Sequence, residues 1–375
     1  MSAKPYFERH LEIKVKELEP DHADDCTLKR KPRDFPRVSG ARPTVSSLAR
    51  LAGVASSTVS RALKGDERIS PAVRRRIAAL AAEAGYTPNA LARGLVGGRS
   101  GLVGLVLGPV SNPIYAEMMQ EAVTEAERRG LRLMLLHAGP GPIEDSTAAA
   151  LLQYRMDGCL ITSAGLSSRA AAICAANDVP VVMLNRVPKL HAVAVSCDNR
   201  AGGEALALHL LETGHRRPAI IMGNADTSTS LERAEAFATA LVEAGLEPPR
   251  RFPGGASHAA GFAAGQAIAG LPARERPDAI FGCADILAMG AMDALREAGL
   301  RVPEDISVVG FDGIAAAAAA PYRMTTLSVP LSAMIARGFG LLAERMSGIP
   351  LPDEVVLLRG TLQRRGTVRD TQPPG

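Results

Sequence analysis

The sequence lacks tryptophan, and aromatic residues make up only 3% of its 375 residues. Its five cysteines show no paired spacing, which argues against a disulfide framework or a metal site and fits a reducing compartment. No apolar run reaches the roughly 18 residues needed to span a membrane, and the charged N-terminal segment lacks the apolar stretch of a secretion signal. We therefore expect a cytoplasmic protein that holds no metal and is not attached to a membrane.

Signatures of catalysis are also missing. The sequence contains no nucleophile elbow, no P-loop and no cluster of metal ligands. The glycine-rich stretch at residues 101–108 (GLVGLVLG) lacks the G-x-G-x-x-G spacing of a dinucleotide-binding turn. We expect neither an enzymatic activity nor a cofactor.

The most informative segment lies at residues 43–95. An amphipathic helix capped by Thr44 is predicted to stop at Gly53, and a second short helix, 56–63, follows a three-residue turn. Two short helices joined in this way form a helix-turn-helix, whose second helix enters the major groove of DNA. Small polar residues and an arginine lie on this second helix, namely Ser56, Ser57, Thr58, Ser60 and Arg61. The pattern predicts a helix that reads DNA.

Charge is distributed unevenly along the chain. Residues 41–99 carry a net charge of +7, although the whole chain carries only +4. A solvated helix face would explain the run Arg74-Arg75-Arg76 by itself, but not the clustering of charge over the whole segment. Such a basic module is typical of a surface that binds phosphates.

From residue 100 onward, apolar runs of strand length alternate with helical stretches. The runs lie at residues 102–107, 131–136, 158–161, 181–184, 219–222, 279–282 and 306–311, and the helical stretches include 116–129, 201–213, 230–244 and 285–298. Continuous apolar strands that alternate with helices indicate parallel sheets covered on both faces. The fold class is therefore α/β, with an N-terminal helix-turn-helix.

Residues 43–99 resemble the headpiece of the lactose-repressor (LacI/GalR) family of bacterial transcription regulators. The resemblance rests on LARLAGVASSTVSRAL at residues 48–63, on Ser70-Pro71 and on GYTPNALARGL at residues 85–95, and it continues to about Arg369. It implies a DNA-binding headpiece (41–87), a hinge helix and linker (88–99), and an effector-binding and dimerisation core (100–375). Residues 1–40 fall outside it; we expect a disordered extension or a stretch upstream of the true start.

The resemblance also assigns roles to headpiece residues. It implies that Ser56, Ser57 and Arg61 face base edges, while Thr44, Thr58 and Ser60 hold backbone phosphates. Asn89 would open the hinge helix, and Leu95 would be a wedge that a dimer inserts into the minor groove, where an apolar side chain between base steps kinks the duplex. An ordinary exposed residue in a linker is the alternative for Leu95.

For the core, the resemblance implies the periplasmic-binding-protein-like arrangement of two Rossmann-like subdomains. The N-subdomain would span about 100–196 and 329–347, and the C-subdomain about 197–328 and 348–369. The chain would cross between them near residues 196, 328 and 348. A ligand cleft in such a core lies beyond the carboxyl ends of the strands.

The effector residues that the resemblance implies follow predicted strands: Tyr115, Asn185, Arg186, Arg233, Asp285 and Asp312. A helix N-cap is the alternative for Asp285, and an ion pair in the cleft is the alternative for Arg233 and Asp312. Arginine forms forked hydrogen bonds with carboxylates, phosphates and vicinal hydroxyls. Two arginines therefore favour an acidic effector, such as a sugar acid or phosphosugar, over a neutral sugar.

These features predict a DNA-binding repressor of a carbohydrate or sugar-acid operon. It would act as a homodimer on a pseudo-palindromic operator and respond allosterically to a small molecule. The alternative is a sugar-binding protein of a transport system, which would leave residues 43–95 unexplained. The sequence leaves open whether the effector weakens or strengthens DNA binding, and whether dimers pair into tetramers.

Overall fold

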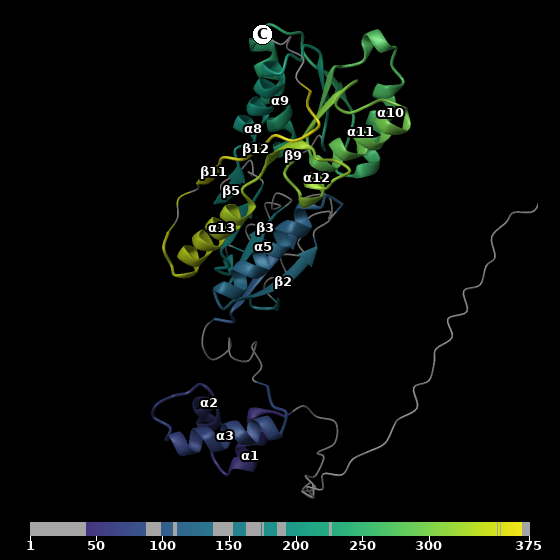
Figure 1. Cartoon of the computed structure of the whole chain (residues 1–375). Coiled ribbons are helices and arrows are strands. Elements are labelled where there is room, and N and C mark those ends of the chain that lie inside the picture. The colour runs from purple at the N-terminus through teal and green to yellow at the C-terminus, as the bar shows by residue number, and fades with distance from the viewer. Residues whose placement is uncertain are drawn as a thin grey trace, which may run out of the picture. The chain divides into compact units, whose positions relative to one another are not determined.

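The computed structural model describes residues 43–87, 99–107, 111–137, 153–162, 174, 176–185, 193–224, 227–350, 352 and 354–369 (Figure 1). The chain divides into two compact units, with the division after Thr87. Three of the predicted site residues, Asn89, Leu95 and Arg186, lie outside the described residues, as do the extension at 1–40 and most of the predicted hinge.

The described part of the first unit, residues 43–87, has three helices, α1 (Val45–Ala52), α2 (Ser56–Leu63) and α3 (Pro71–Glu83). Thr44 caps α1, because its hydroxyl accepts a hydrogen bond from the backbone N–H of Ser47. Gly53 ends α1 at a φ of 65°, in the left-handed region that glycine adopts without strain. The side chains of Leu48, Val59 and Ile77 form the centre of a small separate core. The predicted helix-turn-helix is confirmed.

The second unit contains two six-stranded sheets. The first has the strand order β11-β5-β4-β3-β1-β2 and is parallel throughout. Its strands are β1 (Leu102–Leu107), β2 (Arg132–His137), β3 (Gly158–Ile161), β4 (Val181–Leu184), β5 (Ala194–Cys197) and β11 (Val355–Leu358). Strands β1, β3, β4 and β5 are almost wholly buried, as expected of parallel strands with both faces covered.

The second sheet has the order β12-β10-β9-β8-β6-β7, and only β12 runs antiparallel to its neighbour. Its strands are β6 (Pro218–Ile221), β7 (Arg250–Phe252), β8 (Ala279–Gly282), β9 (Ser307–Asp312), β10 (Thr325–Ser328) and β12 (Thr361–Gln363). The predicted α/β class with two Rossmann-like halves is confirmed.

Helices cover the sheets (Figure 1). They are α5 (Ile114–Arg128), α8 (Asn199–Glu212), α9 (Ser228–Glu243), α10 (His258–Ala269), α11 (Asp285–Glu297), α12 (Ala315–Ala318) and α13 (Leu331–Met346), with a 3-10 turn at Ala273–Glu275. Helices α5 and α13 pack together beside the first sheet, whereas α8 and α9 pack together on one side of the second sheet and α10 and α11 on the other. In the part of the chain that is described, no helix is long and apolar enough to cross a membrane.

One boundary expected from the sequence is wrong. The chain was expected to leave the first sheet near residue 348, but β11 pairs in parallel with β5 of that sheet. Gly348, at a φ of 79°, ends the turn after α13 and returns the chain to the same sheet. The passage to the second sheet therefore falls between β11 and β12.

Candidate functional site

The first candidate site is the outer face of α2. Ser56, Ser57 and Arg61 are exposed on it, and Thr58 and Ser60 are partly exposed, while Val59 and Ala62 are buried beneath. The major groove of DNA admits an α-helix, and small polar side chains and an arginine on the outer face of such a helix can hydrogen-bond to base edges. The side chains expected to read bases therefore lie together on one face.

The N-terminus of α2 is also free to bind an anion. Its N-cap is Ala55, which offers no side-chain acceptor, and the first turn carries no acidic residue. Among the described residues the backbone N–H groups of Ser56 and Ser57 have no acceptor. Unpaired N–H groups and the positive end of the helix dipole are suited to a phosphate.

The arginines of the headpiece differ in their pairing. Arg68 is paired with Asp66, whereas Arg61 forms no ion pair with the described residues. Arg74 donates to the carbonyl of Gly65 at 2.9 Å and Arg76 donates to that of Ala52, and neither forms an ion pair with the described residues. The Arg74–Arg76 run therefore ties α3 to the helix-turn-helix as well as facing solvent.

The second candidate site lies where the carboxyl ends of the two sheets meet. Asn112 follows β1 of the first sheet, and Asp312 is the last residue of β9 in the second. The amide Nδ2 of Asn112 donates to Oδ2 of Asp312 at 3.0 Å, and both residues are buried. This hydrogen bond joins the two sheets at the place where the cleft was expected.

Arg233 of α9 is the centre of this site. Its Nη1 donates to Oδ1 of Asp312 and to the carbonyl of Cys283, and its Nε donates to Oδ1 of Asn199, each at 2.9 Å. Its guanidinium lies 3.7 Å from the centroid of the Phe311 ring. Among the described residues Nη2 makes no hydrogen bond, so one amino group is left for a ligand.

Asp285 does not have the N-cap role that was its alternative. It is the first residue of α11 but does not cap it, because the N-cap is Ala284, without a side-chain hydrogen bond. Its carboxylate is wholly buried and accepts from the backbone N–H groups of Gly313 and Ile314 and from the hydroxyl of Thr326. Burial and the nearby Asp312 carboxylate raise the pKa of Asp285 to about 7. Asp285 therefore supports the turn after Asp312 from behind the cleft.

Comparison with known proteins decides the family. The model described as "Bacterial regulatory proteins, lacI family" matches residues 44–89, and the model described as "Periplasmic binding protein-like domain" matches residues 207–368. The transcriptional regulator CelR of Thermobifida fusca is 32% identical over 317 residues, which cover 82% of this chain and 93% of CelR. The chain belongs to the LacI family of bacterial regulatory proteins. It is a DNA-binding transcriptional regulator.

Solved structures of LacI-family proteins have the same fold. The lac repressor dimer bound to its operator and an anti-inducer superimposes with a TM-score of 0.79 at 25% identity, covering 88% of this chain and all of that one. A complex of CelR with cellobiose has a TM-score of 0.64 at 30% identity and covers 87% of this chain and all of that one. These similar proteins are regulators rather than enzymes. The match at residues 44–89 also favours a regulator over a transport binding protein.

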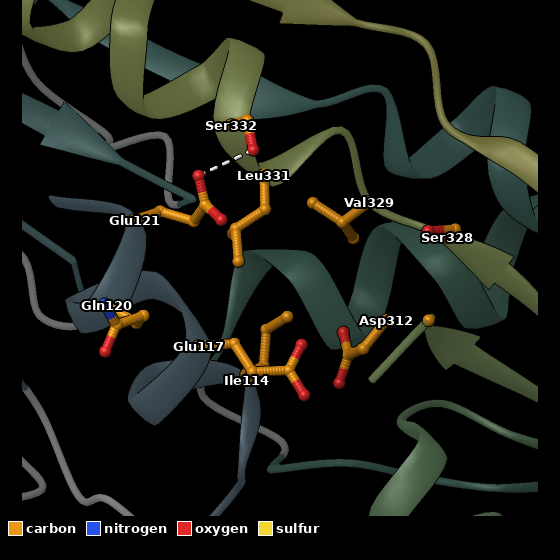
Figure 2. A pocket seen from close by; sticks show the side chains of 10 residues that line it. Ile114, Glu117, Gln120, Glu121, Asp312, Ser328, Val329, Leu331 and Ser332 are labelled. Atoms are coloured by element: carbon orange, nitrogen blue, oxygen red, sulfur yellow. Dashed lines mark hydrogen bonds between the residues drawn. The ribbon is translucent and has the colours of Figure 1, made fainter. Parts of the chain in front are cut away.

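A cavity of about 340 Å³ reaches Asp312 from the side of α5 (Figure 2). Its lining includes Ile114, Glu117, Glu121, Ser328 and Ser332. Two further hydrogen bonds border it: Glu117 accepts from the backbone N–H of Ala315 at 2.8 Å, and Glu121 accepts from the hydroxyl of Ser332 at 2.6 Å. Of the predicted effector residues, this cavity contains Asp312 and not Arg233.

Tyr115 and Asn185, the remaining predicted effector residues in the described part of the chain, are also buried and do not line this cavity. Tyr115 is buried in the hydrophobic core of the second unit, and Asn185 is buried immediately after β4, at a φ of 63°. Sequence reasoning missed Asn112 and Asn199, which bind Asp312 and Arg233. The Asn-Pro pair at 112–113 was a usable signal, because asparagine before a helix accepts a backbone N–H, here that of Ile114 at 3.1 Å.

Proposed function

We propose that this LacI-family protein is a cytoplasmic homodimeric repressor that binds a pseudo-palindromic operator. In the proposal Ser56, Ser57 and Arg61 contact base edges, and Thr44, Thr58 and Ser60 contact phosphates. Asn89 opens the hinge helix and Leu95 kinks the operator centre. The observation that carries the proposal is the exposed polar face of α2, with its uncapped N-terminus and unpaired Arg61.

The structure supports a phosphate contact at Thr44 in particular. Its Oγ1 already accepts from Ser47, but a hydroxyl can accept and donate together, so its proton is available for a phosphate oxygen. The solved lac repressor dimer on its operator supports the homodimer. The domain limits proposed for this arrangement are 41–87, 88–99 and 100–375.

Selection of bound sequences from random duplex DNA tests this proposal. Two copies of a helix-turn-helix related by two-fold symmetry read two half-sites, so the enriched sequence should be a pseudo-palindrome. Enrichment of a single unrepeated half-site would contradict the homodimer, and no enrichment over the starting pool would contradict sequence-specific binding.

For the effector we propose a neutral polyhydroxylated ligand, a sugar, at the Arg233–Asp312 pair. The prediction of an acidic effector from the sequence depended on the charges of Arg186 and Arg233. In the structure Arg233 forms an ion pair with Asp312, with 2.9 Å between Nη1 and Oδ1. Arg186 lies outside the described residues. A neutral pair offers an N–H donor and carboxylate acceptors side by side, which suits vicinal hydroxyls better than a second anion. The CelR–cellobiose complex supports a sugar.

The bond between Asn112 and Asp312 gives the proposed effector a means of changing how the two sheets are joined. A ligand that binds Asp312 either replaces the Asn112 amide or adds to it, and in both cases changes how tightly the two sheets are joined. Allosteric control requires such a difference in ligand affinity between two states. Because the linkage is reciprocal, the direction of the switch follows from whether operator DNA raises or lowers effector affinity.

Calorimetric titration of the full chain with cellobiose, D-ribose and D-glucuronate tests the ligand class. The neutral pair predicts that a neutral sugar binds and that glucuronate, which resembles glucose in shape but carries a carboxylate, binds more weakly. Tighter binding of the acid would overturn the neutral-ligand proposal. The variant Arg233→Gln should weaken binding of the neutral sugar, and Arg251→Gln is its control, because Arg251 forms an exposed ion pair with Glu235.

A further inference from the structure

A second and larger cavity, of about 960 Å³, lies at the opposite ends of the first-sheet strands. It is lined by residues that immediately precede β3 and β4, by the end of α13, and by Arg99, which precedes β1. None of the predicted effector residues lines it. It is therefore distinct from the Arg233–Asp312 site, and neither DNA binding nor sugar binding as proposed above accounts for it.

Three arginines line this basal cavity, Arg99, Arg155 and Arg345. Arg99 donates to the carbonyl of Met346 at 2.6 Å, and Arg345 donates through Nη1 to the carbonyl of Val181 at 3.2 Å. Among the described residues none of the three forms an ion pair. A guanidinium has five N–H donors, so most of these donors, and all three charges, remain available.

Two carboxylates also line the cavity, and among the described residues neither forms an ion pair with the three arginines. Asp157 binds the segment that follows Arg99. Its oxygens accept from the backbone N–H groups of Ser100 and Gly101 at 2.7 and 2.8 Å and from the hydroxyl of Ser100 at 3.0 Å. Asp178 also faces the cavity without forming an ion pair in the described part of the chain. With three arginines and two aspartates, the lining carries a net charge of +1, and its arginines keep donors that no carboxylate of the described residues occupies.

The rest of the lining is apolar and includes Met156, Val179, Pro180, Met346 and Ile349. A concave surface with apolar walls suits a small ligand that has an apolar body as well as a charged group. We propose that the basal cavity binds a small organic phosphate whose phosphoryl group is held by Arg99, Arg155 and Arg345 and whose body packs on these walls. Arginine is suited to this because its planar fork matches phosphate oxygens.

The ligand would contact the segment that leads back to the headpiece. Arg99 follows the predicted linker at 88–99, and the next two residues are tied to Asp157 inside the cavity. A phosphate between Arg99 and Arg345 would fix this segment more firmly to the core.

Calorimetric titration of the full chain with phenyl phosphate tests the proposal, because this probe combines a phosphoryl group with an apolar ring. We expect saturable binding that is at least tenfold stronger than that of inorganic phosphate. We expect a loss of about tenfold in each of Arg99→Gln, Arg155→Gln and Arg345→Gln, as removal of a charged hydrogen-bond donor predicts. Arg337→Gln is the matched control, because Arg337 lies on α13, as Arg345 does, but is paired with Glu344. This variant should bind phenyl phosphate as the wild type does.

Several outcomes would overturn the proposal. They are the absence of binding up to about 10 mM phenyl phosphate, equal affinity for inorganic phosphate, an equal loss in the Arg337→Gln control, or unchanged affinity in all three cavity variants. Weaker binding of random duplex DNA by the cavity variants, without any phenyl phosphate binding by the wild type, would assign the arginines to DNA instead. Because operator and sugar are absent from the titration, its failure leaves the proposed function untouched.

Discussion

Removing the charge of Asp312 should destabilise the core strongly, although the substitution is small. Asp312→Asn keeps the size of the side chain and an oxygen that can accept from Asn112, but it leaves Arg233 without its counterion. The side chains of Arg233 and Asp312 are 5% and 3% exposed, and their contact distance is 2.9 Å. Loss of one partner of a buried ion pair typically costs about 3–5 kcal/mol, because the other charge stays buried and uncompensated.

A double-mutant cycle separates this explanation from simple loss of contacts. Arg233→Met should cost a similar amount, since it leaves Asp312 unpaired near Asp285. The double variant leaves no uncompensated charge from the pair, so its cost should be smaller than the sum of the two single costs. We expect a coupling free energy of about 2 kcal/mol or more. Urea unfolding followed by circular dichroism measures each free energy of unfolding, because the chain has no tryptophan to report by fluorescence.

Glu235→Gln is the control for this cycle. It breaks the ion pair with Arg251, whose side chains are 51% and 40% exposed, so its effect should stay below about 1 kcal/mol. If Asp312→Asn costs no more than this control, or if the costs of the two single variants add, the buried-pair argument is refuted. Variants that remain folded should still bind operator and should need far more sugar to respond; unchanged sugar affinity in both would place the effector elsewhere.

Three further predictions concern the headpiece, the hinge and the turn after β9. Arg61→Ala should abolish specific operator binding and leave the circular dichroism spectrum unchanged, because the side chain is exposed and unpaired; operator affinity and selectivity equal to wild type in a mobility-shift assay would contradict its role. Leu95→Ala should weaken binding to operator more than binding to random DNA at the same salt concentration, since only the true site is kinked; an equal loss on both would remove the wedge. Asp285 has a pKa of about 7 in the fold against 3.8 in a model compound, so the folded state holds the extra proton and the stability due to this group falls as pH rises from 3.8 to 7. The unfolding free energy of the wild type should therefore fall relative to that of Asp285→Asn as pH rises over that range. A difference between the two that does not change with pH would contradict the shift.

The headpiece was predictable from sequence because its determinants are local. The cap at Thr44 and the turn at Gly53 depend on a few consecutive residues, and both are found in the structure. Continuous apolar runs predicted the positions of β1, β3, β4 and β8 for a similar reason, because a strand that is buried on both faces has few polar residues. The short strand β11 was missed because it is an edge strand whose Val355 and Leu357 are exposed, so burial does not mark it.

The role of Asp285 was not predictable, because its partners are distant in sequence. The backbone groups that it binds are 28 and 29 residues away, and Thr326 is 41 residues away. A carboxylate after a strand and before a helix fits a ligand site, an N-cap and a support for a neighbouring turn equally well. Only the packing of α11 against β8 and β9, with the hydrogen bond from Thr326 of β10, selects among them.

The same limit applies to charge. Arg61 and Arg233 are both arginines on helices of a binding site, yet they have different electrostatic effects. Arg61 is exposed and unpaired, so its field extends into solvent and attracts phosphates. Arg233 is paired with Asp312 at 2.9 Å, so the pair carries no net charge. In the proposed effector site it would act on a ligand through directed hydrogen bonds. Counting arginines therefore indicates a phosphate-binding face at Arg61, which forms no ion pair with the described residues, but it overstates the free charge at Arg233, which is paired with Asp312.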